Sequence, residues 1–352
     1  MRYKLLGRTG VRVSEIALGT GTFGTAWGWG SDRDASQSIF DAFAEAGGNF
    51  IDTASGYQDG QAEEFIGSFV KSDRANFVIN TKYTGPPFKN PGVAVTGNSR
   101  KAMTTSIEAS LKRLGMDYVD LYMVHFADGV TPIEEILRGF EDVVRAGKAL
   151  YVGFSDFPAW RIARGATLGE LRNLPVAAIQ IEYSLAERTP ERELLPMADA
   201  LGLTSTLWSV MGAGLLSGKY RAEGVEGRLN RLGNSLGAKD AERTEAILAA
   251  IDAIAAETDA KPAQIAIAWA RAKSRGRAAP LIPILGSRTL DQFKENLGAL
   301  AIDLSSEQVE RLDAASAITL GFPHDILKTE ILRTLAFSGK YDQVDKPSST
   351  VG

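Results

Sequence analysis

The segment 118-YVDLYMVHFADGVTPIEEILRGFEDVVRAGKALYVGFS-155 contains the repeating unit that decides the fold. Its two ends, 118–125 and 150–155, are short and nearly continuous apolar runs, which is typical of strands covered on both faces. Between them, 133–146 has the amphipathic period of a helix, and Gly147 stands where a left-handed residue would end that helix. The segment therefore predicts a strand, a helix and a second, parallel strand.

The same unit recurs along the chain. The predicted strands are 16–19, 49–53, 77–82, 118–125, 150–155, 176–183, 203–209 and 281–287. The predicted helices between them are 34–47, 99–114, 133–146, 158–171, 190–201 and 262–273. Eight strands that alternate with such helices predict an α/β protein with a (β/α)₈ TIM barrel, which needs about 250 residues.

The remaining residues are expected to decorate this barrel. Residues 2–5 and 11–14 predict an N-terminal β-hairpin that closes the barrel bottom, and 305–315 predict an extra C-terminal helix. Long loops are expected after the third and seventh strands, the first of them over 84–100. We expect a single domain over 1–316 and a C-terminal extension over 317–352, whose last 14 or so residues lack an apolar pattern and are expected to be flexible.

One motif favours a different fold. Residues 19-GTGTFG-24 match the G-x-G-x-x-G fingerprint of a Rossmann dinucleotide-binding domain, so a two-domain Rossmann protein is the alternative. In that fold the helix begins at the glycines, whereas here loop residues follow them for about ten positions. We therefore expect these glycines to form a tight loop or to let the backbone approach a ligand at the barrel mouth.

The composition limits the classes of function. Of 352 residues, 39 are basic and 43 acidic, so the net charge of −4 gives no reason to bind nucleic acid or an anionic membrane. The chain has no cysteine and only two histidines, His125 and His324, so we expect no metal site. No apolar run is long enough to span a membrane, and the N-terminus lacks a signal-peptide pattern. These features predict a cytoplasmic enzyme.

Three ionisable residues end three consecutive predicted strands: Asp52, Lys82 and His125. Strand ends of a parallel barrel surround one mouth, and Tyr57 follows Asp52 in the loop above it. Each of these residues alone more often has a structural role, but together each side chain can adjust the protonation or orientation of the next. A lysine cation lowers the pKa of a tyrosine, an aspartate keeps that lysine charged, and a neutral histidine can orient a carbonyl oxygen. The set predicts a proton donor for a carbonyl that receives a hydride.

The chain also resembles the aldo-keto reductases over about residues 1–316. The resemblance rests on several stretches together: 49-NFIDTASGY-57, 79-INTK-82, 110-SLKRLGMDYVDLYMVH-125, 152-VGFSDF-157 and 285-LGSRTLDQFKENL-297. It implies that Asp52, Tyr57, Lys82 and His125 form the family's catalytic tetrad, with Tyr57 as the general acid of reduction. It also implies a nicotinamide cofactor that lies across the barrel mouth without a Rossmann fold.

The resemblance also implies which residues bind that cofactor. Trp208 matches the aromatic residue that stacks on the nicotinamide, and Asp52 is also a cofactor-binding position. The other cofactor positions implied are Thr20, Gly21, Ser155, Asp156, Gln180, Ser209, Val210, Met211, Gly212, Gly214, Lys219, Arg228, Gly286, Arg288, Gln292, Glu295 and Asn296. Asp156 stands where much of the family has Asn, and an ionised Asp can only accept hydrogen bonds. Arg288 favours NADP(H), although Gln292 replaces an arginine of many members, so NAD(H) stays possible.

The substrate is expected to be a small carbonyl compound or the corresponding alcohol. The resemblance implies that loops after the first, third and fourth strands and the C-terminal region form the pocket wall. In this sequence the wall is then aromatic and consists of Phe23, Trp27, Trp29, Tyr83, Phe88 and Phe126. Such a wall suits an apolar substrate. The sequence indicates no oligomeric state.

Two alternatives to a carbonyl reductase stay open. One is a cofactor-binding regulatory subunit similar to the potassium-channel β subunits, although all four tetrad residues are retained. The other is a Schiff-base aldolase that uses Lys82 as its nucleophile.

Overall fold

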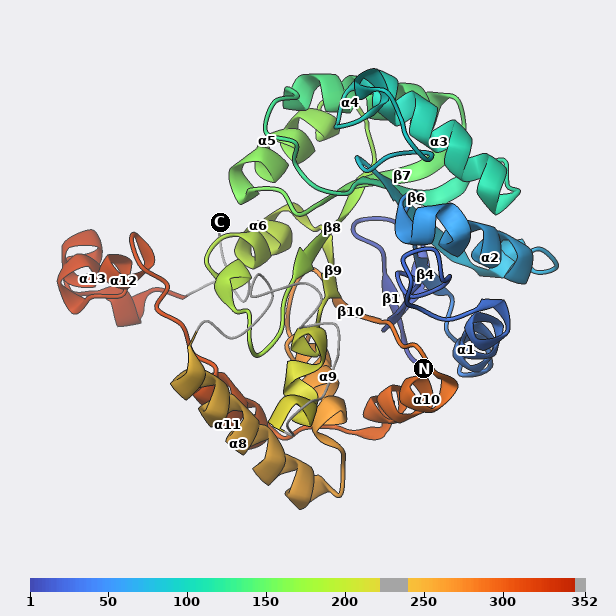
Figure 1. Ribbon diagram of the computed structural model, residues 1–352. Helices are drawn as coiled ribbons and strands as arrows, with labels where there is room; N and C mark the ends of the chain where they lie inside the picture. Colours follow the sequence, from blue (N-terminus) through green and yellow to red (C-terminus); the bar gives the residue numbers. More distant parts are fainter. Residues whose placement is uncertain (222–239, 346–352) are drawn as a thin grey trace.

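A closed parallel barrel forms the centre of the molecule in the computed structural model, which describes residues 1–221 and 240–345 (Figure 1). Within these residues the strands follow one another around the barrel in chain order, and the last strand pairs with the first in parallel. The barrel strands are β3 (Ala17–Gly19), β4 (Phe50–Asp52), β5 (Val78–Tyr83), β6 (Val119–Val124), β7 (Ala149–Ser155), β8 (Val176–Glu182), β9 (Thr204–Trp208) and β10 (Leu281–Leu285). The predicted (β/α)₈ barrel is confirmed, and the Rossmann alternative is wrong.

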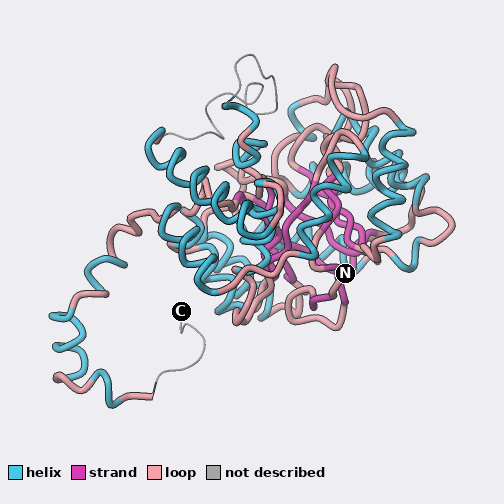
Figure 2. The backbone as a smooth tube through the Cα atoms, turned by 90° about the horizontal axis from the view of Figure 1, so that it is seen from below, coloured by secondary structure: helices cyan, strands magenta, loops and turns pink. Residues whose placement is uncertain are grey.

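Helices surround the barrel and cover its strands (Figure 2). The longer ones are α1 (Arg33–Glu45), α2 (Gln61–Phe69), α3 (Arg100–Leu114), α4 (Ile133–Arg145), α5 (Ala159–Glu170), α6 (Leu194–Leu201), α8 (Ala241–Thr258), α9 (Pro262–Ala272), α10 (Leu290–Leu297) and α11 (Ser306–Ala315). Of these, α2, α8 and α10 were not among the predicted helices. The helix predicted over 190–201 begins only at Leu194, because Thr189–Glu191 form a separate 3₁₀ turn.

The apolar residues of α4 explain why these segments form helices against the barrel. Ile133, Ile136, Leu137 and Phe140 recur at helical spacing and are all buried. Burying side chains of this size contributes about 1.5–3 kcal/mol each. The following turn includes Gly147, whose φ of +70° places it in the left-handed region as expected.

The predicted N-terminal hairpin is also confirmed and closes the bottom of the barrel. Strands β1 (Tyr3–Leu5) and β2 (Arg12–Ser14) pair in antiparallel fashion. Leu6 and Val13 are fully buried and belong to one apolar cluster with Phe50, Leu121 and Met123, which lie on barrel strands. The opposite end, where the strands finish, is left open for a site.

The C-terminal region lies beside the barrel. The predicted helix at 305–315 is confirmed as α11, and beyond it α12 (His324–Leu327) and α13 (Glu330–Phe337) lead away from the barrel (Figures 1 and 2). Among the described helices, none has the length and apolar character needed to cross a membrane.

Candidate active site

The four tetrad residues meet at the open end of the barrel. Lys82 Nζ lies 2.9 Å from Asp52 Oδ2 and 3.4 Å from the Tyr57 hydroxyl. The Tyr57 ring meets His125 edge to face, with ring centroids 5.6 Å apart. The barrel causes this convergence, because β4, β5 and β6 are neighbours and end on the same side.

Asp52 is the centre of a buried hydrogen-bond network. Its Oδ1 accepts hydrogen bonds from Asn80 Nδ2 and Gln180 Nε2, both at 2.7 Å, while Oδ2 accepts from Lys82. All of these side chains are almost fully buried. A carboxylate that is paired and hydrogen-bonded in this way is held in one position.

Sequence reasoning missed Asn80. It stands two residues before Lys82 on β5, so the two side chains point to the same face of the strand. This alternation is the signal that could have found it. Asn80 therefore helps to hold the carboxylate that holds the lysine.

Lys82 is charged. Its burial would lower the pKa of the ammonium group, but Asp52 and Tyr57 outweigh this effect and raise the pKa. Nζ also donates a hydrogen bond of 2.8 Å to the carbonyl oxygen of Thr53. A Schiff-base aldolase needs a neutral lysine that a substrate can reach, so this fully buried ion pair argues against that alternative.

His125 is neutral. Burial lowers the pKa of its imidazole to about 3, and the Lys82 cation adds to this effect. The ring packs between Tyr57 and Phe126, whose ring centroid is 5.5 Å away. A neutral imidazole at the mouth can donate a hydrogen bond without titrating near pH 7.

Three residues predicted to hold a nicotinamide lie on neighbouring strands: Ser155 ends β7, Gln180 stands two residues before the end of β8, and Trp208 ends β9. Ser155 Oγ is buried and has no hydrogen-bond partner among the described residues. Gln180 uses its amide nitrogen on Asp52 and on Thr206 Oγ1, so its amide oxygen is the remaining polar atom. Buried polar atoms of this kind normally have partners, so Ser155 fits a site for a ligand amide.

Asp156 and Trp208 form a pair at the rim. Trp208 Nε1 donates a hydrogen bond of 3.0 Å to Asp156 Oδ1. Desolvation at the mouth raises the pKa of Asp156 to about 6, although the Trp208 hydrogen bond and Lys82 oppose the rise. The side chain of Asp156 still reaches solvent there. Asp156 therefore orients the indole predicted to stack on the cofactor.

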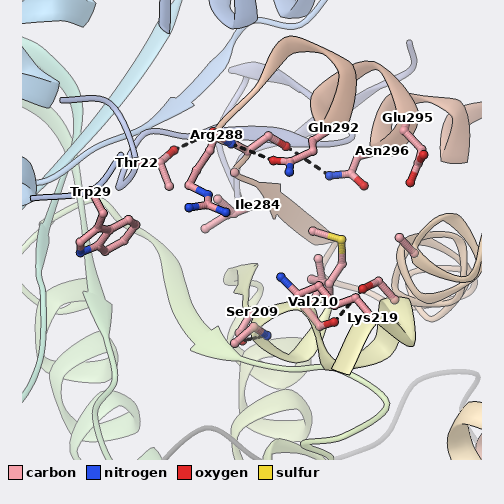
Figure 3. Close-up of a pocket in the computed structure, with 17 residues that line it drawn as sticks. Thr22, Trp29, Ser209, Val210, Lys219, Ile284, Arg288, Gln292, Glu295 and Asn296 are labelled. Carbon is pink, nitrogen blue, oxygen red and sulfur yellow. Dashed lines mark hydrogen bonds between the residues drawn. The ribbon is translucent and has the colours of Figure 1, made fainter. Parts of the chain in front are cut away.

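A cavity of about 320 Å³ adjoins the mouth between the turn after β9 and the start of α10 (Figure 3). The predicted cofactor residues that line it are Ser209, Val210, Met211, Gly214, Lys219, Gly286, Arg288, Gln292, Glu295 and Asn296. Two cations, Lys219 and Arg288, stand among polar and apolar neighbours. The cavity therefore combines charges that suit phosphates with surfaces that suit a base.

The remaining predicted cofactor residues differ in position. Thr20 is fully buried and donates its hydroxyl to the carbonyl oxygen of Asp52, whereas Gly21 lies against the Tyr57 ring. Gly212 is buried in the turn after β9. Arg228 lies outside the described residues.

The predicted aromatic wall is smaller than expected. Phe23 and Tyr83 are fully buried in the hydrophobic core, so their place in the wall is a misassignment. Tyr83 follows Lys82 directly, and alternation along β5 turns it toward the covering helices. Trp27, Phe88 and Phe126 are exposed. Trp29 is half-buried and lines the cavity beside Arg288.

The long loop after β5 is closed at its base. Thr84 donates a hydrogen bond of 2.8 Å to Asn98 Oδ1, and Asn98 donates one of 3.0 Å to the carbonyl oxygen of Phe126. The Asp128 carboxylate accepts from the backbone nitrogen of Asn98. Burial would raise the pKa of Asp128, but hydrogen bonds from Thr131 and Asn98 lower it to about 2. These contacts fix the side of the mouth that carries Phe126.

A closed parallel barrel with an Asp–Lys–Tyr–His cluster and an adjoining cavity at its open end suits an oxidoreductase that uses a nicotinamide cofactor. The chain belongs to the aldo-keto reductases: the Aldo/keto reductase family model matches residues 15–317.

Curated relatives are similar over most of the chain. A norsolorinic acid reductase of Aspergillus flavus is 34% identical over 333 residues, which is 92% of this chain and 83% of the relative. An aryl-alcohol dehydrogenase [NADP(+)] of Phanerodontia chrysosporium is 34% identical over 340 residues, covering 90% and 86%. An aryl-alcohol dehydrogenase of Pestalotiopsis microspora is 33% identical over 341 residues, covering 93% and 85%.

Proposed function

We propose that this protein is an NADPH-dependent reductase that converts apolar aldehydes and ketones, aromatic ones in particular, to alcohols in a reversible reaction. The observation that carries the proposal is the Tyr57 hydroxyl, which lies 3.4 Å from the buried Lys82 ammonium group and beside a neutral imidazole. When bound, a nicotinamide cofactor supplies the hydride for the carbonyl carbon.

Tyr57 is the proton donor in this proposal. As negative charge develops on the carbonyl oxygen, the phenol gives up its proton to that oxygen. The Lys82 cation stabilises the phenolate that remains, and Asp52 keeps Lys82 charged and directed toward Tyr57. In the direction of alcohol oxidation, the same phenolate accepts the proton.

His125 orients the substrate. Because its pKa is about 3, the imidazole is neutral at physiological pH and donates an N–H hydrogen bond to the carbonyl oxygen. Trp27 and Phe126 adjoin the Tyr57–His125 pair: the Trp27 ring lies 6.5 Å from that of Tyr57, and the Phe126 ring lies 5.5 Å from that of His125. Exposed rings at this place suit an aromatic or other apolar carbonyl compound.

The chain also carries the groups that a nicotinamide dinucleotide needs. Ser155, Gln180 and Trp208 would hold the nicotinamide, while Lys219 and Arg288 would hold phosphates. We infer a preference for NADPH, because the guanidinium of Arg288 can pair with a 2′-phosphate that NADH lacks. One aryl-alcohol dehydrogenase relative is named for NADP(+), which supports this preference.

A spectrophotometric assay tests the proposal. Purified protein is mixed with NADPH or NADH and a panel of substituted benzaldehydes and straight-chain aldehydes, and kcat/KM is compared. We expect turnover with NADPH and higher values for aromatic aldehydes. A preference for NADH would overturn the cofactor assignment. Tight NADPH binding with no turnover of any carbonyl would favour the regulatory-subunit alternative.

A further inference from the structure

The glycine-rich segment 19–24 that matched the Rossmann fingerprint leads into a closed loop, residues 22–31, which we call the tryptophan loop. Its two ends are joined by backbone hydrogen bonds, from Ser31 N to Thr22 O at 2.7 Å and from Gly24 N to Ser31 O at 2.8 Å. The loop carries Trp27 and Trp29, which are separated by Gly28 alone.

The ends of the tryptophan loop are attached to the cofactor side of the mouth. Thr22 Oγ1 donates a hydrogen bond of 2.8 Å to the carbonyl oxygen of Ser287, and Ser31 Oγ donates one of 2.8 Å to that of Arg288. Glycine is required inside the loop, since Gly30 has φ +134° and a Cβ there would collide with the carbonyl oxygen of Gly24. These hydrogen bonds therefore fix the loop in one position at the edge of the cavity.

The two indoles face different sites. Trp29 lines the cavity that contains Arg288, on the side opposite Glu295 and Asn296 (Figure 3). Trp27 instead meets the Tyr57 ring edge to face at 6.5 Å. The rings also contact each other, with centroids 5.9 Å apart.

One buried side chain holds the backbone of both tryptophans, while Asp59 Oδ1 accepts a hydrogen bond of 3.2 Å from the indole nitrogen of Trp27. Gln58 is fully buried; its Oε1 accepts from the backbone nitrogen of Trp27, and its Nε2 donates to the carbonyl oxygen of Trp29, each at 3.1 Å. Gln58 directly follows Tyr57, so the residue beside the proposed acid also fixes the loop.

Building on the proposed function, we propose that Trp29 is a cofactor-binding residue, Trp27 is a substrate-binding residue, and Gln58 is the positioning residue that sets both. An indole face is a large apolar surface held by only two rotatable bonds, which suits it to cover one side of a bound dinucleotide. This assignment moves Trp29 out of the substrate wall predicted from the sequence.

Calorimetric titration with NADPH in the absence of substrate tests the assignment of Trp29. We expect Trp29→Leu to raise the Kd for NADPH about tenfold and to leave the KM for an aromatic aldehyde within twofold when the cofactor is saturating. Trp27→Leu should raise the KM for the aldehyde about tenfold and leave the Kd for NADPH within twofold. Gln58→Ala should raise both the Kd for NADPH and the KM for the aldehyde. Trp160→Leu, on the exposed outer face of α5, is the matched control and should change neither.

Hydrogen exchange on the wild-type protein gives a second test that does not depend on how a variant folds. NADPH alone should slow exchange of backbone amides in residues 22–31. A Trp29→Leu protein that binds NADPH within twofold of the wild type, or no added protection of the loop, overturns the inference. If the wild-type protein binds neither NADPH nor NADH, it is the proposed function that fails.

Discussion

The two halves of the barrel mouth are built differently. In the tetrad half, Asp52, Lys82 and Asn80 are nearly inaccessible, and strand backbones hold them in place. In the half that carries the proposed cofactor residues, which we call the cofactor half, Arg288 and Lys219 come from turns and are exposed. Chemistry needs groups fixed within a fraction of an ångström, whereas binding a long charged ligand needs a surface that the ligand can reach. The comparison predicts that changes in the first half alter kcat and changes in the second alter cofactor affinity.

The largest effect is expected in the tetrad half. Tyr57→Phe should lower kcat about 10²–10⁴-fold, because it removes one positioned proton donor, while the Kd for NADPH stays within twofold. Lys82→Met should be comparably damaging, since it removes the cation next to the phenol. Steady-state kinetics and calorimetric titration measure the two quantities. A Tyr57→Phe enzyme with more than a tenth of the wild-type kcat would refute Tyr57 as the acid.

A smaller effect is expected in the cofactor half, where cofactor affinity should change and kcat should not. Arg288→Gln should weaken NADPH binding roughly 10–100-fold, the loss expected for a charged pair with phosphate, and should leave NADH binding and the saturated kcat nearly unchanged. Lys294→Gln removes an exposed cation from α10 outside the cavity and is the control for net charge. Equal losses for NADPH and NADH would show that Arg288 does not recognise the 2′-phosphate.

The smallest effect is expected at Asp156, where the two halves meet. Its folded-state pKa of about 6 lies above the ordinary value of 3.8, so the stabilisation it provides is present below about pH 4 and is lost as the pH rises through 6. Relative to the wild type, Asp156→Asn should therefore gain stability between pH 4 and 6. The gain should stay below about 1 kcal/mol, because solvent screens the exposed side chain.

Urea denaturation at several pH values between 4 and 7 measures this difference. Asn retains an oxygen that can accept from Trp208, so the variant should keep the indole in place. If the difference in free energy of unfolding between the two proteins does not change with pH over this range, the raised pKa of Asp156 is contradicted.

The sequence alone predicted the barrel well, because its strands are buried on both faces and each is followed by polar or glycine-rich residues. It also placed Asp52, Lys82 and His125 at neighbouring strand ends, which the structure brings together. Side-chain direction was harder to predict. Tyr83 and Phe23 were assigned to the pocket wall but are core residues, and Asn80 was overlooked although alternation places it beside Lys82.

Periodicity and residue chemistry, both local properties of the chain, determined that this protein is a parallel barrel with Asp52, Lys82 and His125 at its open end. Only the tertiary structure decided which aromatic side chains reach that opening and that Trp29 lines the cavity that contains Arg288. The reason is that a loop side chain takes its direction from distant partners, here Gln58, Ser287 and Arg288, and these contacts leave no pattern in the neighbouring sequence.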